Sequence, residues 1–540
     1  GVMPQTREHL AILKLLRIER GVVVVTKADL VDPELHDLAI ADIQEALTDT
    51  FLTNAPVITV SAISGAGLPE LLREIDQQAV AGTGRDSSAP CRLPVDRAFS
   101  KQGFGTVVTG TLFSGTLCEG AVLEIVPGGH KARVRGLQVH GRKRDRVLAG
   151  QRVAINLAIP GQVDLTRGVW LLEPGLFAAS RILDVYLEIL TGMSPLIHQE
   201  RVRVHHGTAE IMGRVALLEE DELPGGESGY AQLLLEAPLS ADFGDRFVIR
   251  RYSPAQTIGG GQVLHPRSRR WRRRSAIALA RLAAYREKRY AAALSATLRE
   301  TGMSALSQSE LMQQLPFSAR TQVWQQLADD GILYRLADGY VHNETLVDIE
   351  KRIETLLKAY QAQHPHRLGL AREILQANLQ ITPAQLANIL QNMGSRGAVA
   401  LSGRLVCESG HSPTFEGSTG KTMESLLERL SATSLVDEAE LVKDLPSEAE
   451  QIVSDWLESG RILRIGGGIC VTPANLETIK RQLRCIFHSA PQQTAAQLRD
   501  ALGTTRKFII PLLEHLDDSG FTRRQGDRRS LAETHLASPP

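Results

Sequence analysis

The chain contains 540 residues, of which 61 are basic and 61 are acidic, so it carries no formal net charge. This length is several times that of one domain, which predicts about three to seven domains and excludes a single hydrophobic core. The balanced charge excludes a protein that is basic overall, so any nucleic-acid surface must be a local patch.

The five cysteines are widely spaced and show no C-x-x-C pattern. This spacing argues against both a disulfide framework and a cysteine metal site, and it indicates a reducing compartment. No apolar run approaches the roughly 20 residues that span a bilayer, and the N-terminus lacks a signal-peptide pattern. We therefore expect a cytoplasmic protein with no membrane partner.

The segment GVVVVTKADL, residues 21–30, places a run of valines before a polar cluster. The valines predict a buried parallel strand, and the helical patterns around it give a βα succession that binds ligands at the carboxyl end of the strand. A second strand pattern, APVITV, ends in SAISG, residues 61–65. An ordinary βα turn is the alternative interpretation.

The two polar clusters resemble the guanine-recognition boxes of GTPases, N-K-x-D and S-A-x-x-G, in the expected order. The resemblance implies that Asp29 accepts hydrogen bonds from N1 and N2 of guanine, while the stem of Lys27 lies along the ring. Backbone groups of Ser61 and Ala62 would contact the guanine O6. Thr26 replaces the usual asparagine, which removes an amide contact. Adenine lacks the matching donors and would leave the carboxylate unpaired, so the site would reject it.

The phosphate half of such a site requires G-x-x-x-x-G-K-[ST] between a strand and a helix. The stretch TFEGSTGKT, residues 414–422, has Phe415 where the first glycine belongs and follows a loop pattern, so we interpret it as a linker and a helix start. The opening GVMPQTREHL resembles the helix after the D-x-x-G loop of translational GTPases. We therefore expect the phosphate loop and the magnesium ligands upstream of residue 1, and we assign no catalytic residue and no protein metal site.

Residues 92–158 alternate short β-rich runs with glycine turns, which predicts a small antiparallel barrel. GFGTVVTGT and AGQRVAINL in this block resemble the second domain of elongation factor Tu. Residues 181–265 resemble its third domain, through VRVHHGTAEIMGRV and GDRFVIRRYSPAQTIGGGQVL. His205 and His206 are adjacent on a predicted strand and so face opposite sides, which argues against a shared metal ion.

Asp96, Arg97 and Arg152 stand where the aminoacyl pocket of the second domain is expected from this resemblance. Two arginines that face one carboxylate leave a residual positive charge, which suits an anionic side chain. Selenocysteine is such a residue, because its selenol is ionised at neutral pH, whereas serine and cysteine are largely neutral. Over nearly its whole length the chain resembles the selenocysteine-specific elongation factor (SelB) family, bacterial type. An ordinary barrel rim is the alternative for both arginines.

The chain from about Pro266 is helical in pattern and repeats. Residues 309–341 and 439–471 both read as a helix, a Leu-Pro turn, a helix with a tryptophan, and a hairpin; 496–531 is a third copy and 368–407 a weaker one. This pattern predicts four winged helix-turn-helix modules, and hence a multidomain α/β, β-barrel and winged-helix fold. The expected domains are a GTPase half (1–84), two barrels (85–173, 174–265) and four winged helices (266–345, 346–415, 416–478, 479–540).

The winged modules differ in charge. Residues 423–460 carry ten acidic and two basic residues, so this third module should repel phosphate. The last module is the better RNA-binding candidate, since a helix start and a turn would meet one backbone from two directions. Its candidate residues are Arg506, Lys507, Arg523, Arg524, Arg528 and Arg529. Spacers or protein-binding modules are the alternative. We interpret the run RSRRWRRR, residues 267–274, as a charged helix start that contacts transfer RNA or the ribosome.

The resemblance as a whole implies a GTP-dependent translation elongation factor that delivers selenocysteinyl-transfer RNA to the ribosome at UGA codons. Its tail would bind a messenger-RNA hairpin, the selenocysteine insertion element, and tether the cargo near the codon. We expect GTP with magnesium as the cofactor, a monomer, and GTPase activity in the intact protein, but an inactive GTPase half in this chain alone. The alternatives are a winged-helix RNA-binding adaptor with a vestigial GTPase half, and a general elongation factor, against which the appended modules argue.

Overall fold

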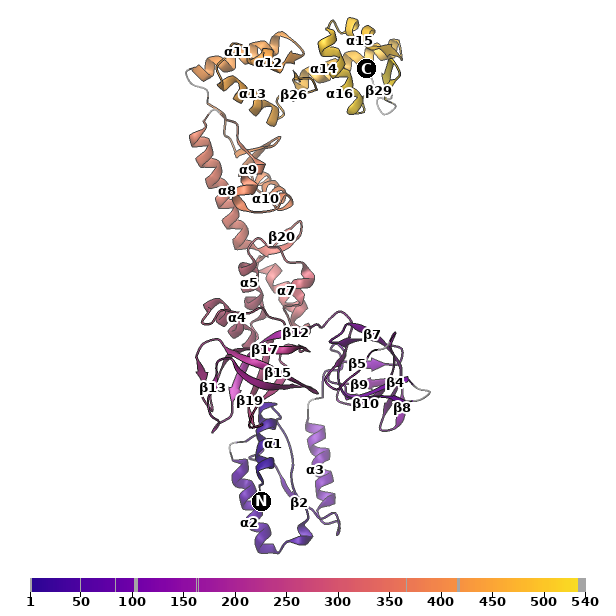
Figure 1. The fold of residues 1–540 in the computed structure, drawn as a ribbon, viewed down its shortest axis with the longest axis vertical. Helices are drawn as coiled ribbons and strands as arrows, with labels where there is room; N and C mark the ends of the chain where they lie inside the picture. The colour runs from indigo at the N-terminus through magenta and orange to yellow at the C-terminus, as the bar shows by residue number, and fades with distance from the viewer. Residues whose placement is uncertain are drawn as a thin grey trace. The chain divides into compact units, whose positions relative to one another are not determined.

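The computed structural model describes residues 2–532 except 49, 83, 102–104, 162, 164, 366 and 415–417. The chain divides into two compact units (Figure 1), the first made of residues up to 301 with 306–332, and the second of 302–305 with 333 onward. Among the described residues no helix has the length and apolar character needed to cross a membrane.

The first unit begins with a small α/β layer. Strands β1 and β2 pair in parallel, with Val24 opposite Ile58, as expected for a βα succession. The valines of β1 are half-buried, so our prediction of a buried strand was wrong; the described residues give β1 a single neighbouring strand. The elements are α1 (Pro4–Leu15), β1 (Val23–Val25), η1 (Ala28–Leu30), α2 (Pro33–Leu47), β2 (Val57–Thr59) and α3 (Leu68–Ala81).

The first barrel closes because β10 pairs with both β4 and β7, which completes the ring β10-β4-β3-β11-β6-β7. Alternating inward residues such as Leu93, Val108 and Ile155 form its core. In GFGTVVTGT, Gly103 and Phe104 lie outside the described residues, and the remainder is β4. The strands are β3 (Arg92–Lys101), β4 (Gly105–Thr111), β5 (Thr116–Cys118), β6 (Val122–Val126), β7 (His130–Val139), β8 (Arg142–Arg144), β9 (Arg146–Leu148), β10 (Arg152–Ala158) and β11 (Trp170–Leu172).

The second barrel is closed in the order β12-β17-β15-β14-β18-β19. The run Gly259–Gly261 is required at its tightest point, since a Cβ on Gly261 would lie 2.1 Å from the carbonyl oxygen of Tyr186. The strands are β12 (Ala179–Ile189), β13 (Leu196–Ile197), β14 (Glu200–His206), β15 (Ala209–Leu217), β16 (Glu222–Leu223), β17 (Ser228–Ser240), β18 (Arg246–Arg251) and β19 (Thr257–His265).

A buried ion pair joins the two barrels. Arg92 of β3 donates to both carboxylate oxygens of Asp245, at 3.0 and 2.5 Å, and both side chains are almost fully buried. His206 Nε2 lies 2.9 Å from the same carboxylate, while the adjacent His205 is half-buried on the opposite face of β14. Trp170 stacks against Arg92, with its ring centre 4.9 Å from the guanidinium. A buried ion pair therefore connects the two barrels in addition to their apolar contacts.

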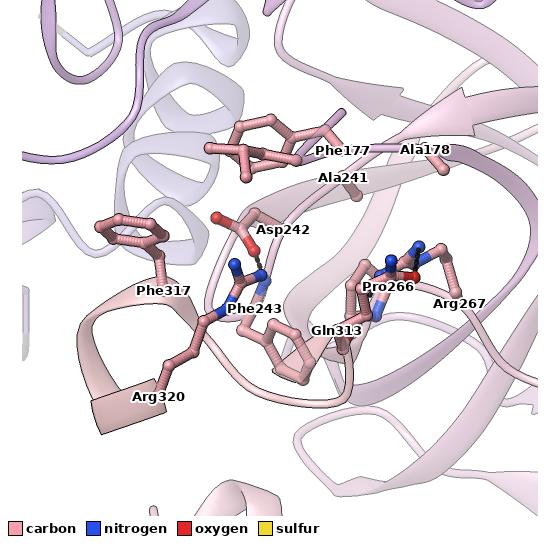
Figure 2. A pocket seen from close by; sticks show the side chains of 11 residues that line it. Phe177, Ala178, Ala241, Asp242, Phe243, Pro266, Arg267, Gln313, Phe317 and Arg320 are labelled. Carbon is pink, nitrogen blue, oxygen red and sulfur yellow. Dashed lines mark hydrogen bonds between the residues drawn. The ribbon is translucent and has the colours of Figure 1, made fainter. Parts of the chain in front are cut away.

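Helices after the second barrel pack back onto it. The run of residues 267–274 does not begin a helix, contrary to our prediction, because α4 starts after it with Ser275 as its cap. Trp271 of this run lies between Arg269 and Arg281, and its Nε1 donates to the buried Asp184 at 3.3 Å. Figure 2 shows the adjoining pocket, in which Arg320 and Asp242 point toward one another. The helices are α4 (Ala276–Arg286), α5 (Tyr290–Thr301), α6 (Gln308–Met312), η2 (Phe317–Ala319) and α7 (Arg320–Asp329).

The second unit opens with a hairpin that we predicted to complete the first winged helix. Its residues Leu336 and Val341 instead share a core with Leu357 and Ile389 of the following module. The module itself has the winged pattern, with β24 between β22 and β23. The elements are β20 (Leu333–Leu336), β21 (Gly339–His342), α8 (Asn343–Gln363), β22 (Leu370–Ala371), α9 (Arg372–Leu379), α10 (Pro383–Ser395), β23 (Val399–Ser402) and β24 (Leu405–Glu408).

The last two winged helices share one hydrophobic core, in which Ile469 of the third module packs with Leu483, Leu512 and Phe521 of the fourth. Helix α14 crosses the boundary that we predicted after residue 478. In the stretch TFEGSTGKT, residues 415–417 lie outside the described residues, and α11 begins directly after them. The elements are α11 (Ser418–Ala432), β25 (Val436–Asp437), α12 (Glu438–Val442), α13 (Glu448–Glu458), β26 (Leu463–Arg464), β27 (Ile469–Val471), α14 (Pro473–Ser489), β28 (Gln493–Thr494), α15 (Ala495–Ala501), α16 (Arg506–Asp518), β29 (Thr522–Gln525) and β30 (Arg528–Leu531).

Candidate functional site

The two guanine-recognition boxes meet at the carboxyl ends of β1 and β2. The hydroxyl of Ser61 donates to Oδ1 of Asp29 at 2.6 Å and accepts from the backbone N–H of Ser64 at 3.2 Å. Ser61 is buried, whereas Asp29 is exposed. The buried serine therefore orients an accessible carboxylate, and this contact connects residues 32 positions apart in the sequence.

The loops around this carboxylate are open to solvent. Lys27 has a left-handed backbone (φ 60°), and its side chain is exposed, as are Thr26 and Ala62. Gly67 is required behind the second loop, because a Cβ there would lie 2.0 Å from the carbonyl oxygen of Thr59. Within this loop the backbone N–H groups of Ser61 and Gly65 donate to the carbonyl oxygens of Ala66 and Ser61. The exposed carboxylate of Asp29 beside the loop fits the two donors of a guanine edge.

The predicted aminoacyl pocket lies on adjacent strands of the first barrel. Strand β4 runs between β3 and β10, and its Thr109 is paired with Arg97 while its Thr111 is paired with Arg152. Arg152 Nη1 lies 2.5 Å from Oδ2 of Asp96, and the Thr109 hydroxyl donates to the other carboxylate oxygen. The structure thus brings together the three residues that the sequence predicted to form the pocket.

The charge of this cluster follows from the state of Asp96. Burial acts to raise the pKa of its carboxyl, but hydrogen bonds from Thr109 and Arg152, with the charges of Arg152 and Arg97, hold the pKa below its usual value. Asp96 is therefore ionised at neutral pH. Its single negative charge balances one of the two arginines, so the three side chains together carry one positive charge. The side chain of Arg152 is 56% exposed, so an incoming anion can reach the guanidinium.

The structure divides the predicted RNA-binding residues of the last module. Arg529 is buried and its Nε donates to Asp517 at 2.8 Å, so it has a structural role and the prediction of an RNA-facing side chain was wrong. Lys507 lies 2.6 Å from Asp437 and 3.5 Å from Glu440, both of the third module. The exposed candidates are Arg506, Lys507, Arg523, Arg524 and Arg528, and among the described residues only Lys507 of these five has an ion pair.

Sequence reasoning missed a second group of basic residues on α14. Lys480 and Arg484 lie over the ring of Phe521, at 5.7 and 5.4 Å from its centre, and Arg481 is exposed beside them. Phe521 directly precedes β29, so these side chains lie close to the start of the wing. Their spacing of four residues along a helix was the available signal.

Comparison with known proteins agrees with this architecture. Over 98% of its length the chain is 32% identical to the selenocysteine-specific elongation factor of Desulfomicrobium baculatum, of which it covers 86%. The chain belongs to the family of selenocysteine-specific elongation factors. Another member of the family, from Escherichia coli (strain K12), is 30% identical over 99% of the chain and 85% of its own length.

Separate parts of the chain match the domains of this family. Residues 184–270 match the beta-barrel domain of the selenocysteine-specific elongation factor, and 487–531 match the winged helix of elongation factor SelB. Residues 1–81 match the GTP-binding domain of elongation factor Tu, and 105–172 its domain 2. A crystal structure of a bacterial selenocysteine-specific elongation factor shares the fold, with a TM-score of 0.65 at 24% identity over 99% of this chain and 84% of that one. The multidomain fold predicted from the sequence is confirmed.

Proposed function

We propose that the chain delivers selenocysteinyl-transfer RNA to the ribosome at UGA codons, as a cytoplasmic monomer that depends on GTP. The observation that carries the proposal is the uncompensated positive charge around Asp96 in a barrel of the elongation-factor type. A selenolate gains from this charge, whereas the neutral hydroxyl of serine does not. The test is UGA read-through in cells that lack their own factor. Read-through that needs both the full-length protein and a downstream messenger-RNA hairpin supports the proposal, and read-through without the hairpin contradicts it.

In this proposal Asp29 accepts hydrogen bonds from N1 and N2 of the guanine, and the stem of Lys27 packs on the ring. The loop at Ser61 and Ala62 completes the base site. The Asp29–Ser61 hydrogen bond supports this role because it fixes the carboxylate that must accept from the base. GTP bound with magnesium supplies phosphoryl-transfer chemistry. We propose that the magnesium ligands and the phosphate loop lie outside residues 1–540.

Residues 1–540 are therefore expected to bind GTP more weakly than micromolar and not to hydrolyse it, because phosphate and magnesium contacts supply most of the binding and the chemistry. Calorimetry with GTP and with guanosine checks this, and both should bind with similarly low affinity. The Asp29→Asn variant, which loses the paired acceptor for guanine, is the control for binding through the base. Micromolar binding of GTP with release of phosphate would contradict the prediction.

The C-terminal modules, in this proposal, bind the messenger-RNA hairpin and raise the effective concentration of the cargo at the codon without adding a contact there. Exposed arginines at the start of α16 and in the wing of the last module support a backbone-binding role. Because the third module is acidic and shares a core with the fourth, it is expected to support the fourth module while contributing few phosphate contacts itself.

Adjacent arginines in the wing provide a matched pair of variants. Arg528→Ala is expected to weaken hairpin binding several-fold and to reduce the log–log salt slope by about 0.7 to 0.9, since one phosphate contact is lost. Arg529→Ala is expected instead to lower the melting temperature of the module, since it leaves Asp517 without its buried partner. Salt titration of RNA binding and thermal unfolding of both variants make the comparison. Equal losses of RNA affinity at unchanged melting temperature would contradict the assignment.

A further inference from the structure

A strip of basic residues runs along β7 and β8 of the first barrel and has no assigned role. Between Lys131 and Arg144 the sequence contains six basic residues and no acidic one, although the whole chain is neutral. On β7 the basic residues alternate with buried Ala132 and Val134, so they point to solvent, and all of β8 is exposed. The basic strip consists of Lys131, Arg133, Arg135, Arg142, Lys143 and Arg144.

The strip is largely uncompensated by acidic side chains. Lys143 pairs with Glu119 at 3.4 Å, and the other strip residues have no ion pair within the part of the chain that the structure describes. Glu124 lies opposite Lys131 on β6, but its carboxylate accepts a hydrogen bond from the backbone of Gly175. Five of the six strip residues thus lack an ion pair among the described residues, and Lys143 is paired with Glu119.

The second barrel shows the contrasting arrangement. Three of its arginines are matched to carboxylates, among them Arg201 on Glu236 at 2.7 Å and Arg203 on Glu210 at 2.6 Å. Arg251 is likewise paired with Glu200 at 2.8 Å. Three arginines of the second barrel thus have carboxylate partners, whereas five of the six strip residues have none among the described residues. The strip is therefore a surface suited to an external anion.

We propose that the basic strip binds an RNA phosphate backbone, separately from the pocket at Asp96 and from the winged helices. Phosphate contacts need charge but no apolar centre, whereas the core of a protein interface is apolar. The exposed positions of β7 and β8 are all polar or charged, which favours RNA over an acidic protein. The source is either transfer RNA or ribosomal RNA; this choice rests on the proposed function.

The placement of the strip fits RNA that also reaches the pocket. Strand β10 pairs with β7, with Ala154 opposite Gln138, so Arg152 lies near the end of β7 from which the chain turns into β8. From there the strip extends along β7 to Lys131, roughly 25 Å at about 3.3 Å per residue. An RNA strand that leaves the pocket along β7 would meet several strip residues in succession.

The test compares two triple variants of the 540-residue chain that remove the same charge. Arg133→Gln, Arg135→Gln and Arg144→Gln are made in the strip, and Arg201→Gln, Arg203→Gln and Arg214→Gln in the second barrel. Both are made with Arg523→Glu and Arg528→Glu, so that the tail does not dominate RNA binding. Binding of deacylated transfer RNA, of salt-washed small ribosomal subunits and of polyglutamate is titrated against salt.

The strip variant is expected to bind one or both RNAs about tenfold more weakly at physiological salt, with a log–log slope smaller by about 2 to 3, because three phosphate contacts are lost. The control variant is expected to stay within about twofold of the parent. A loss with transfer RNA supports that source, and a loss with ribosomal subunits supports the other. Unchanged affinity for both RNAs, or a loss confined to polyglutamate, would overturn the proposal.

Two further measurements keep the strip separate from the proposed function. Melting temperature is compared for both variants, and the exposed strip residues should leave it unchanged. Hairpin binding by the strip variant with its tail arginines restored, and its preference for selenocysteinyl over seryl cargo in the full-length protein, should also be unchanged. Loss of that cargo preference in the strip variant would overturn the assignment of the strip as a surface separate from the pocket.

Discussion

Arg92→Ala is expected to lower the free energy of unfolding of the paired barrels by about 3–5 kcal/mol, because it leaves Asp245 charged and buried without its main partner. Asp245 is contacted by both Arg92 guanidinium nitrogens, by His206 and by the backbone N–H of Asp242 at 2.8 Å. Urea unfolding followed by tryptophan fluorescence measures the loss, since Trp170 stacks on Arg92.

The control for this prediction is Arg201→Ala in the second barrel. Arg201 also pairs with a carboxylate, Glu236, but both side chains are about half exposed. Exposed pairs contribute roughly 0–1 kcal/mol, so this variant should be nearly as stable as the parent. A similar effect of both substitutions would mean that burial of the Arg92 pair does not determine its contribution.

The same pair makes stability depend on pH. Burial acts to raise the pKa of Asp245, but the charge of Arg92 and the contacts with His206 outweigh it, so the pKa in the folded protein is below the usual value. A carboxyl with a lowered folded pKa contributes stability above its unfolded pKa of about 3.9 and loses it as the pH falls through the folded pKa. The difference in unfolding free energy between the parent and Arg92→Ala should therefore be full above about pH 4 and shrink as the pH falls through the folded pKa, which urea unfolding at several pH values measures.

Arg97→Ala and Arg152→Ala are expected to reduce affinity for selenocysteinyl-transfer RNA about tenfold to a hundredfold, because hydrogen bonds to charged groups contribute about 1.5–3 kcal/mol. Affinity for seryl-transfer RNA should change by less than about threefold, because a neutral hydroxyl gains little from either arginine. The ratio of the two dissociation constants, measured with GTP in the full-length protein, is the relevant quantity. Arg214→Ala, a distant exposed arginine, is the control.

Asp96→Asn separates charge from structure at the same pocket. It removes the carboxylate that Arg152 and Thr109 hold, which frees positive charge while keeping a side chain of similar size. The preference for selenocysteinyl cargo should then persist or increase, in contrast to its loss in the arginine variants. Equal weakening of both cargos by all three substitutions would assign these residues to the structure of the barrel rim.

Several features were predictable because short sequence patterns determine them. The two guanine boxes follow strand patterns, and parallel strands bring their carboxyl ends to one edge, so the contact between Asp29 and Ser61 follows from the sequence order. The pocket residues Asp96, Arg97 and Arg152 were instead named from the resemblance to elongation factor Tu, and the pairing of β4 with β3 and β10 brings their strands side by side.

Other features depended on contacts between distant segments. Arg528 and Arg529 are indistinguishable in the sequence, but alternation on β30 sends one to solvent and the other to Asp517. The arginine run around Trp271 looked like a helix start, yet the partner that orders it, Asp184, lies 87 residues away. The half-burial of β1 likewise depends on which elements cover it, and the strand's own composition does not specify them.

The shared core of the last two winged helices has a mechanical consequence. A force applied to RNA bound at the wing would be transmitted to the preceding module through the shared core, which contains both Phe521 and Ile469. The ion pair between Lys507 and Asp437 is a second contact between the same two modules. The two modules should therefore unfold together under force, and a pulling experiment should show a single unfolding event. If the wing holds a messenger RNA under tension, the RNA would be attached to a rigid pair of modules.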